Sequence, residues 1–148
     1  MTEAGWKRIA RPDLGLELCY PDPTPSGRPV DRDDEPFRRH RRVHLSSTDR
    51  CELYVEVVRF DGLSPQDEYR EHRAYLEERL GAGSVTELTE TGVGGQTAPA
   101  YAFRWDEEGG SMERSVLLLT AAGVTYRVIF DPRSELNRRI VAGLTPAG

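Results

Sequence analysis

Two strand-like segments joined by only two residues place the tightest limit on how this chain folds. SVLLLTA (115–121) and VTYRVIF (124–130) are rich in apolar and β-branched residues, and Ala122 and Gly123 lie between them. A connection of two residues is typical of a β-hairpin. These segments therefore predict two neighbouring antiparallel strands and a sheet that contains them.

Alternating apolar residues predict further strands along the chain. DLGLELCY (13–20) has its leucines on one face and stops at Pro21, as a half-buried strand does. CELYVEVVRF (51–60) carries apolar side chains on both faces, so we expect both faces of its sheet to be covered. Strand character also appears in residues 41–46, in residues 84–90 and in the run with Tyr101, Phe103 and Trp105.

A helix is predicted from Ser64 to Leu80. Ser64 is a favourable N-cap, and Pro65 suits the first helical position, where no N–H is needed. Gly81 and Gly83 then end the helix, because glycine readily adopts the left-handed conformation. The stripe that we expect to rest on a sheet consists of Tyr69, His72, Leu76 and Leu80.

These elements predict an α+β fold. Strands dominate, short turns join consecutive strands, and the second helix, capped by Ser134, lies far from the first in the sequence. We expect a mainly antiparallel sheet of about six or seven strands with two principal helices packed on it. A chain of 148 residues with 37% hydrophobic content fits a single domain over residues 1–148, with a proline-rich acidic surface loop at 22–36.

Charge and cysteine content suggest where the protein works. The net charge of -5 predicts long-range repulsion of nucleic acids and anionic membranes. The N-terminal segment has no continuous apolar core, and no window reaches the length of a membrane-spanning helix. We therefore expect a cytoplasmic protein without membrane insertion, in which Cys19 and Cys51 are reduced, buried, small apolar residues.

The glycines at positions 92, 94 and 95 do not predict a phosphate site. A dinucleotide fingerprint needs a further glycine at the position of Thr97, and it needs a helix afterwards. The residues that follow alternate like a strand instead, and no Gly-Lys-Ser/Thr occurs in the chain. We expect these glycines to form a turn or bulge between antiparallel strands.

The histidines and serines do not form a recognisable catalytic or metal-binding pattern. His40 and His44 lie in a strand-like segment, where four residues span roughly 13 Å, too far to share one ion. His72 follows Glu68 by four residues on the predicted helix, which favours a weak ion pair between them. Ser111 lacks the Gly-x-Ser-x-Gly setting of a nucleophile. We therefore assign no catalytic residue, metal ligand or cofactor from the sequence.

The densest basic run, residues 38–44, is the one candidate partner surface. An acidic segment, residues 31–35, lies just upstream, so the basic run either folds back on these charges or contacts another protein. Nucleic acid is disfavoured by the acidic total. The residues proposed for this surface are Phe37, Arg38, Arg39, Arg41 and Arg42.

The order of elements resembles the PsbP-like fold family. This family includes the photosystem oxygen-evolving subunit PsbP, a nuclear-import regulator that binds the small GTPase Ran, and many bacterial lipoproteins. The segments that carry the likeness are GLELCYP (15–21), FDGLSPQDEYREHRAYLEERL (60–80), VGGQTAPAYAF (93–103) and GVTYRVIFDP (123–132).

The resemblance implies binding rather than catalysis. Since family members act by docking to other proteins, we expect a non-enzymatic protein-binding or chaperone-like adaptor domain, whose partner is another protein. An aromatic set that we expect to reach from the core to a groove would serve this role: Tyr101, Phe103, Trp105, Tyr126 and Phe130. The alternative is a small-ligand-binding protein or enzyme with a pocket between the sheet and helix 64–80, which uses His72, Tyr69 or a nearby carboxylate. An enclosed pocket with convergent polar groups favours this alternative, whereas an open apolar patch favours docking.

Overall fold

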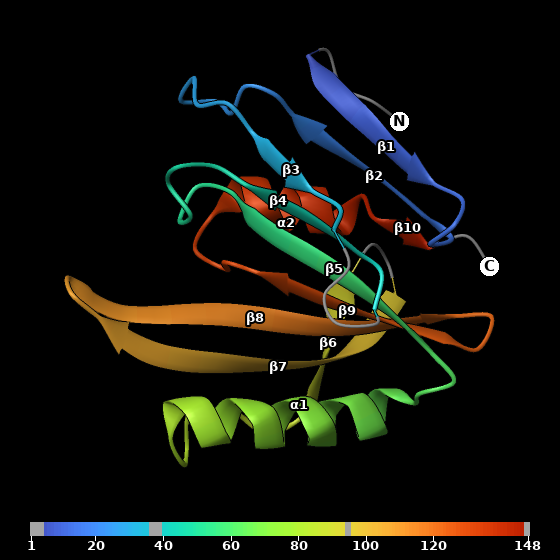
Figure 1. The fold of residues 1–148 in the computed structure, drawn as a ribbon, viewed down its shortest axis with the longest axis vertical. Coiled ribbons are helices and arrows are strands. Elements are labelled where there is room, and N and C mark those ends of the chain that lie inside the picture. Colours follow the sequence, from blue (N-terminus) through green and yellow to red (C-terminus); the bar gives the residue numbers. More distant parts are fainter. Residues whose placement is uncertain (1–4, 36–39, 94–95, 147–148) are drawn as a thin grey trace.

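The protein forms two antiparallel sheets and two helices, as a computed structural model describes for residues 5–35, 40–93 and 96–146 (Figure 1). The larger sheet has seven strands in the order β3-β4-β5-β9-β8-β7-β6. These strands are β3 (Asp31–Asp33), β4 (Arg42–Ser46), β5 (Tyr54–Asp61), β6 (Thr89–Val93), β7 (Gln96–Glu107), β8 (Gly110–Ala121) and β9 (Val124–Phe130). The smaller sheet has the order β1-β2-β10, with β1 (Trp6–Arg11), β2 (Leu16–Pro21) and β10 (Thr145–Pro146). The predicted α+β class and antiparallel sheet are confirmed.

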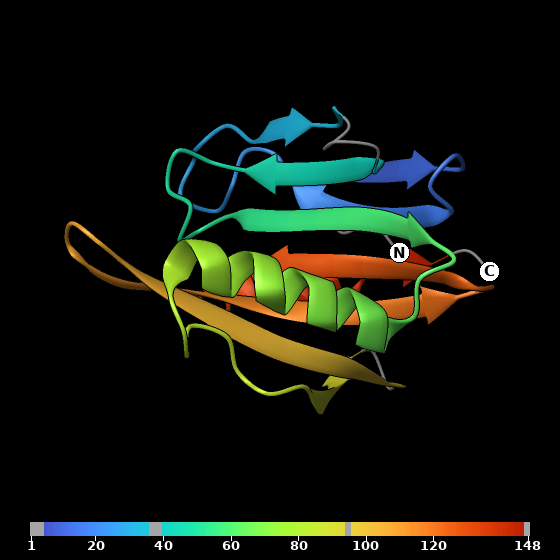
Figure 2. The same ribbon diagram turned by 60° about the horizontal axis from the view of Figure 1, so that its bottom comes forward.

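The two faces of the seven-stranded sheet are covered by different layers. Helix α1 (Pro65–Leu80) packs on one face, against β7 and β8. The small sheet and helix α2 (Glu135–Ala142) lie on the other face, where α2 packs against β2, β5 and β9. Figure 2 shows α1 running across the sheet, with β3 and β4 to one side of it. Val57 and Val58, which point to opposite faces of β5, are both buried, so the expectation that both faces of this strand are covered is confirmed.

The β8–β9 hairpin is the connection that the sequence predicted. Ala121 pairs with Val124, so only Ala122 and Gly123 form the turn. Both turn residues have positive φ, 50° at Ala122 and 79° at Gly123, as a type I′ turn requires. The local twist of this turn matches that of the strands, which keeps β8 and β9 paired along their length.

Helix α1 begins and ends at its predicted signals. The Ser64 side chain accepts a hydrogen bond from the backbone N–H of Asp67 at 3.1 Å, and Pro65 takes the first helical position. Gly81 closes the helix with a φ of 104°, a conformation that favours glycine. Because Glu68, His72 and Leu76 are spaced by four residues, they share one face, and all three are buried against the sheet.

Two hydrophobic clusters fill the space on either side of the large sheet. The cluster between the two sheets and α2 includes Leu16, Leu18, Val55, Val57, Tyr126 and Ile140. The cluster under α1 includes Leu76, Tyr101, Phe103, Val116, Leu118 and Ile129. Apolar residues that alternate along β8 and β9 thus supply both cores, since successive side chains of a strand point to opposite faces.

Several predicted boundaries were wrong. The strand expected at residues 84–90 begins only at Thr89, and Val85 makes a single bridge to Phe103. The predicted surface loop at 22–36 contains the short strand β3, because its residues 31–33 pair with β4. Strands β1 and β10 were not predicted, because their residues lack a clear alternation.

Cys19 and Cys51 are not joined in a disulfide, and neither is buried. Cys19 is half-buried and Cys51 is exposed. Cys19 lies on β2 between Leu18 and Tyr20, which point into the core, so its own side chain points away from it. Cys51 lies in the turn before β5. The prediction that both are core residues was wrong.

The glycine segment joins two antiparallel strands. Gly92 lies within β6 and pairs with Thr97, and the last pair of this hairpin is Val93 with Gln96. The expected strand after the glycines is therefore confirmed, while Gly94 and Gly95 lie outside the described residues. None of the described helices is long and apolar enough to cross a membrane.

Candidate functional site

A pocket of about 280 Å³ lies between α1 and the seven-stranded sheet. Phe60, Phe103 and Ile129 line it from the sheet, and His72 and Leu76 line it from the helix. Tyr75, Glu71, Glu56 and His40 complete the lining together with Glu68 and Arg127. The pocket thus has apolar and aromatic walls with a few polar groups, which is the usual make-up of a ligand site.

The central polar feature of this pocket is an ion pair between Glu68 and Arg127. Arg127 donates from Nη1 to Oε1 of Glu68 at 2.7 Å, and the two side chains are only 11% and 2% exposed. Burial raises the pKa of Glu68, and the charge and hydrogen bond of Arg127 oppose this shift only in part. The Glu68 carboxylate therefore has a single side-chain partner, which does not fully offset the free-energy cost of burying its charge.

The same ion pair is not saturated with hydrogen bonds. Nε of Arg127 is buried and has no hydrogen-bond partner among the described residues. The guanidinium carbon lies 5.2 Å from the centre of the Phe60 ring, so an aromatic face provides part of its environment. Because most buried polar groups are satisfied, an orphan donor beside a pocket is unusual.

His72 and Tyr101 form a second polar pair beside the pocket. Nδ1 of His72 lies 2.5 Å from the hydroxyl of Tyr101, and both side chains are buried. Burial lowers the pKa of His72 to about 2 and raises the pKa of Tyr101, so both groups are neutral at pH 7. The predicted ion pair between His72 and Glu68 was wrong, because each residue has a different partner.

The proposed partner surface is only partly described. Arg41 donates to the backbone oxygen of Asp13 at 2.8 Å. Arg42 pairs with Asp33 at 2.9 Å and with Glu56 at 2.8 Å. Asp33 belongs to the acidic segment 31–35, so the basic and acidic runs contact each other at this point. Phe37, Arg38 and Arg39 lie outside the described residues, and their role stays a prediction.

His40 and His44 pack against different aromatic rings. The centroid of His40 lies 4.3 Å from that of Phe60, and the centroid of His44 lies 4.7 Å from that of Tyr54. Burial lowers the pKa of His44. Among the described residues, no group of three or more histidine, cysteine or acidic side chains is arranged to hold a metal ion.

The aromatic set that was expected to form a groove is divided between the two cores. Tyr101 and Phe103 lie under α1, whereas Tyr126 and Phe130 lie on the opposite face of the sheet. These four side chains are buried, and only Trp105 is half-buried. The prediction that this set reaches from the core to a groove was wrong for the set as a whole, because β7 and β9 direct these rings to opposite faces.

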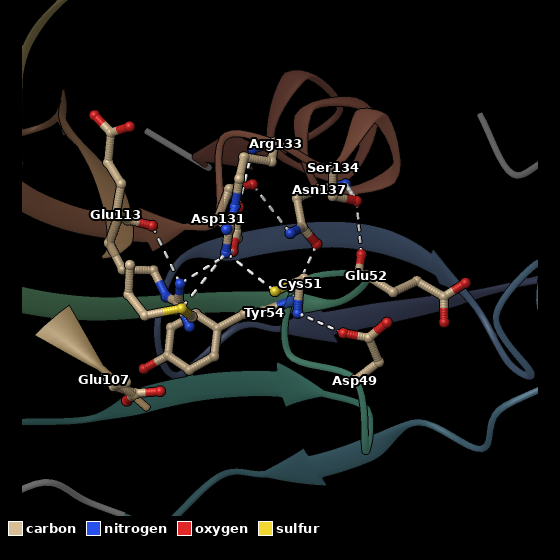
Figure 3. Close-up of polar contacts among 12 residues, drawn as sticks. Asp49, Cys51, Glu52, Tyr54, Glu107, Glu113, Asp131, Arg133, Ser134 and Asn137 are labelled. Atoms are coloured by element: carbon tan, nitrogen blue, oxygen red, sulfur yellow. Dashed lines mark hydrogen bonds and ion pairs between the residues drawn. The ribbon is translucent and has the colours of Figure 1, made fainter. Parts of the chain in front are cut away.

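A second polar cluster lies where β9 meets α2, around Asp131 (Figure 3). The Asp131 carboxylate is fully buried and pairs with Arg114 at 3.0 Å and with Arg133 at 2.7 Å. It also accepts the backbone N–H of Arg133 at 2.9 Å. Asn137 donates to the backbone oxygen of Asp131 and accepts the backbone N–H of Tyr54, each at 3.1 Å.

This second cluster is a structural junction. Burial alone would raise the pKa of Asp131, but hydrogen bonds from Arg133 and the charge of Arg114 hold it below its usual range. Figure 3 shows Cys51 beside Arg133, with 3.0 Å between Sγ and Nη2. The carboxylate is thus fully engaged by the chain itself, and Asn137 ties α2 to the sheet through backbone groups of Asp131 and Tyr54.

A larger hollow of about 520 Å³ lies beside the β8–β9 turn and β10. Its lining consists of aliphatic residues, prolines and threonines such as Leu119, Pro99 and Thr145, with no ionisable side chain among the described residues. The smaller pocket under α1 therefore offers more specific chemistry. Sequence reasoning had pointed to the place and to His72, but it missed Arg127, whose side chain looks like one more charge on a strand.

Comparison with known proteins identifies the fold. No protein-family model and no curated protein matches the chain. The solution structure of cyanobacterial PsbP (CyanoP) from Synechocystis sp. PCC 6803 is similar, with a TM-score of 0.64 and 12% sequence identity over 97% of this chain and 94% of that one. The protein therefore has the PsbP-like fold, as its sequence indicated.

A second similar structure is a crystal structure from Bacteroides thetaiotaomicron VPI-5482. It has a TM-score of 0.58 and 12% identity over 96% of this chain, which spans only 48% of that chain. Identities this low establish a shared fold but no shared ligand or partner. The function must therefore be argued from the residues of this chain.

Proposed function

We propose that this protein binds a small molecule in the pocket between α1 and the seven-stranded sheet. The observation that carries the proposal is the convergence of a buried, unsaturated ion pair, Glu68 with Arg127, on a pocket with apolar walls. Pockets of this make-up are where ligands most often bind. The neutral His72 adds hydrogen-bonding capacity without adding charge.

The chemistry of the pocket supports binding more than turnover. With a pKa of about 2, His72 does not exchange protons near pH 7, as a general acid or base must. Among its described lining residues the pocket has no serine, threonine or cysteine to act as a nucleophile. The role that fits these residues is to hold and orient a ligand.

The protein-binding or chaperone-like adaptor role, implied by the resemblance, is the second candidate. It needs an exposed apolar face, and four of the five rings expected to supply one are buried. What favours it is edge strand β6 (Thr89–Val93), which is largely exposed and can accept a partner strand. Co-purification that recovers no partner from the native host counts against it.

Fragment binding followed by NMR tests the small-molecule proposal. We expect small fragments to shift the backbone amide signals of α1, β5 and β9, which surround the pocket. Glu71→Trp places an indole at the exposed rim and should abolish these shifts. Glu78→Trp makes the same change at an exposed position of α1 outside the pocket and should preserve them. Shifts that are absent, or that survive Glu71→Trp, would contradict the proposal.

A further inference from the structure

Aromatic rings gather around the pocket from both of its walls. Phe60 and Phe103 come from the sheet, and Tyr75 and His72 come from α1. The face of an aromatic ring carries partial negative charge and attracts cations. Two of these rings already carry a cation of the protein itself: the guanidinium carbon of Arg127 lies 5.2 Å from the centre of the Phe60 ring, and that of Arg79 lies 4.0 Å from the centre of the Tyr75 ring.

The charged groups of the lining are mostly acidic. Glu56, Glu68 and Glu71 line the pocket together with one guanidinium, that of Arg127. Arg42 shares its charge between Glu56, at 2.8 Å, and Asp33, at 2.9 Å, and Arg127 offsets the charge of Glu68. Glu71 is exposed at the rim and makes no ion pair with any described residue. Among the described residues, the Glu71 carboxylate therefore has no ion-pair partner.

The Glu68 carboxylate at the base of the pocket also has an unused hydrogen-bond acceptor. Oε1 of Glu68 accepts from Arg127, whereas Oε2 makes no hydrogen bond with the described residues. A carboxylate accepts several hydrogen bonds and donates none. An ammonium group can donate to this oxygen, but a ligand carboxylate would meet repulsion there.

We infer, on the basis of the proposed small-ligand function, that the pocket selects an organic cation, an amine or quaternary ammonium group carried on a compact apolar body. The rings and the residual acidic charge favour the cationic group, and Leu76, Phe103 and Ile129 receive the apolar body. The volume of about 280 Å³ lies near the lower limit of ligand pockets, so the ligand is small.

Three compounds with a common body test the selection of charge. Phenethylamine, phenethyl alcohol and phenylacetate are cationic, neutral and anionic at pH 7. We expect NMR titration to give phenethylamine a dissociation constant about five-fold lower than that of the alcohol, with phenylacetate weakest. Glu71→Gln should weaken binding of the amine by about two- to five-fold and leave the alcohol unchanged. Glu78→Gln, on the outer side of α1, should change neither.

The outcomes separate the two proposals. If the alcohol or phenylacetate binds this pocket as tightly as the amine, cation selection is wrong while ligand binding stands. If Glu71→Gln affects the amine and the alcohol equally, the rim carboxylate does not act through its charge, which also overturns the inference. If neither these compounds nor the fragments shift the amide signals of α1, β5 and β9, the proposed small-molecule binding is itself wrong.

Discussion

Two buried ion pairs at the same sheet differ in how many partners their carboxylates have. Asp131 at the β9–α2 junction receives Arg114, Arg133 and a backbone N–H, and these contacts hold the pKa of its carboxyl below the usual range. Glu68, on the buried face of α1, receives only Arg127, and burial raises the pKa of its carboxyl. The chain itself satisfies the hydrogen-bonding capacity of the Asp131 carboxylate, whereas the Glu68–Arg127 pair keeps an unsatisfied donor at Arg127 Nε.

The difference separates the charges that serve the fold from those that the proposed function leaves for a ligand. A saturated network fixes the position of its elements, because any change leaves a buried group unsatisfied. An unsaturated pair next to a pocket stabilises less and keeps hydrogen-bonding capacity that a bound molecule can use. This contrast leads to three tests, from the largest expected effect to the smallest.

Removing the saturated carboxylate should destabilise the protein most. Asp131→Ala leaves Arg114 buried without its counter-charge, and we expect the free energy of unfolding in urea to fall by about 3–5 kcal/mol. Asp61→Ala is the control, since Asp61 pairs with Arg59 at the surface, and it should leave stability close to that of the wild type. A loss at Asp131 no larger than at Asp61 would show that the junction is not the stabilising cluster.

The pocket should make the protein sensitive to mild acid through His72. The unfolded histidine takes up a proton below pH 6.5, whereas the folded one stays neutral down to about pH 2. Stability from this group is therefore complete above pH 6.5 and falls by about 1.4 kcal/mol for each pH unit below it. Between pH 6.5 and 5.0, we expect wild type to lose about 2 kcal/mol more than His72→Gln does.

Urea unfolding of both proteins at a series of pH values measures this difference. Glu68, whose pKa is raised, acts with the opposite sign, and His44, whose pKa is lowered, acts with the same sign. Both groups are present in the two proteins, so their effects cancel in the comparison. Parallel stability curves for wild type and His72→Gln would show that His72 is not neutral and buried.

Replacing the unsaturated pair by apolar residues should cost little. In Glu68→Leu with Arg127→Met, neither charge is left without a partner, and we expect the free energy of unfolding to stay within about 1 kcal/mol of wild type or to rise. The matching change at the junction, Asp131→Leu with Arg114→Met, should remain destabilising. It leaves the Arg133 backbone N–H without its acceptor. Equal losses at the two places would remove the distinction between them.

Local signals in the sequence predicted most of the elements of the fold. The Ser64 cap, the glycines after Leu80 and the two-residue turn at Ala122 act over a few residues, so they can be seen without knowing the tertiary structure. Strands β1, β3 and β10 could not be found in this way, because pairing with another strand, rather than alternation of their own, makes them strands. Strands β1 and β3 pair with the strands that follow them, and β10 pairs with β2 near the other end of the chain.

The candidate site was harder to predict for the same reason. The spacing of Glu68 and His72 suggested that the two interact, but their partners are Arg127 and Tyr101, which come from strands far along the chain. Charge on a strand usually means exposure to water, so nothing near Arg127 in the sequence marks it as buried. The pocket between α1 and the sheet was foreseen as a place, while its chemistry depends on these long-range pairs.

Helix α1 is inserted between β5 and β6, two strands that do not pair with each other, and glycines of positive φ, Gly62 and Gly81, stand at its two ends. The helical wall of the pocket is therefore one continuous segment of the sequence, and it takes no part in the strand pairing that maintains the sheet. Under the proposed function, substitutions in this segment can change ligand preference without altering the strand pairing, and a protein engineer can graft a different helix between Gly62 and Gly81.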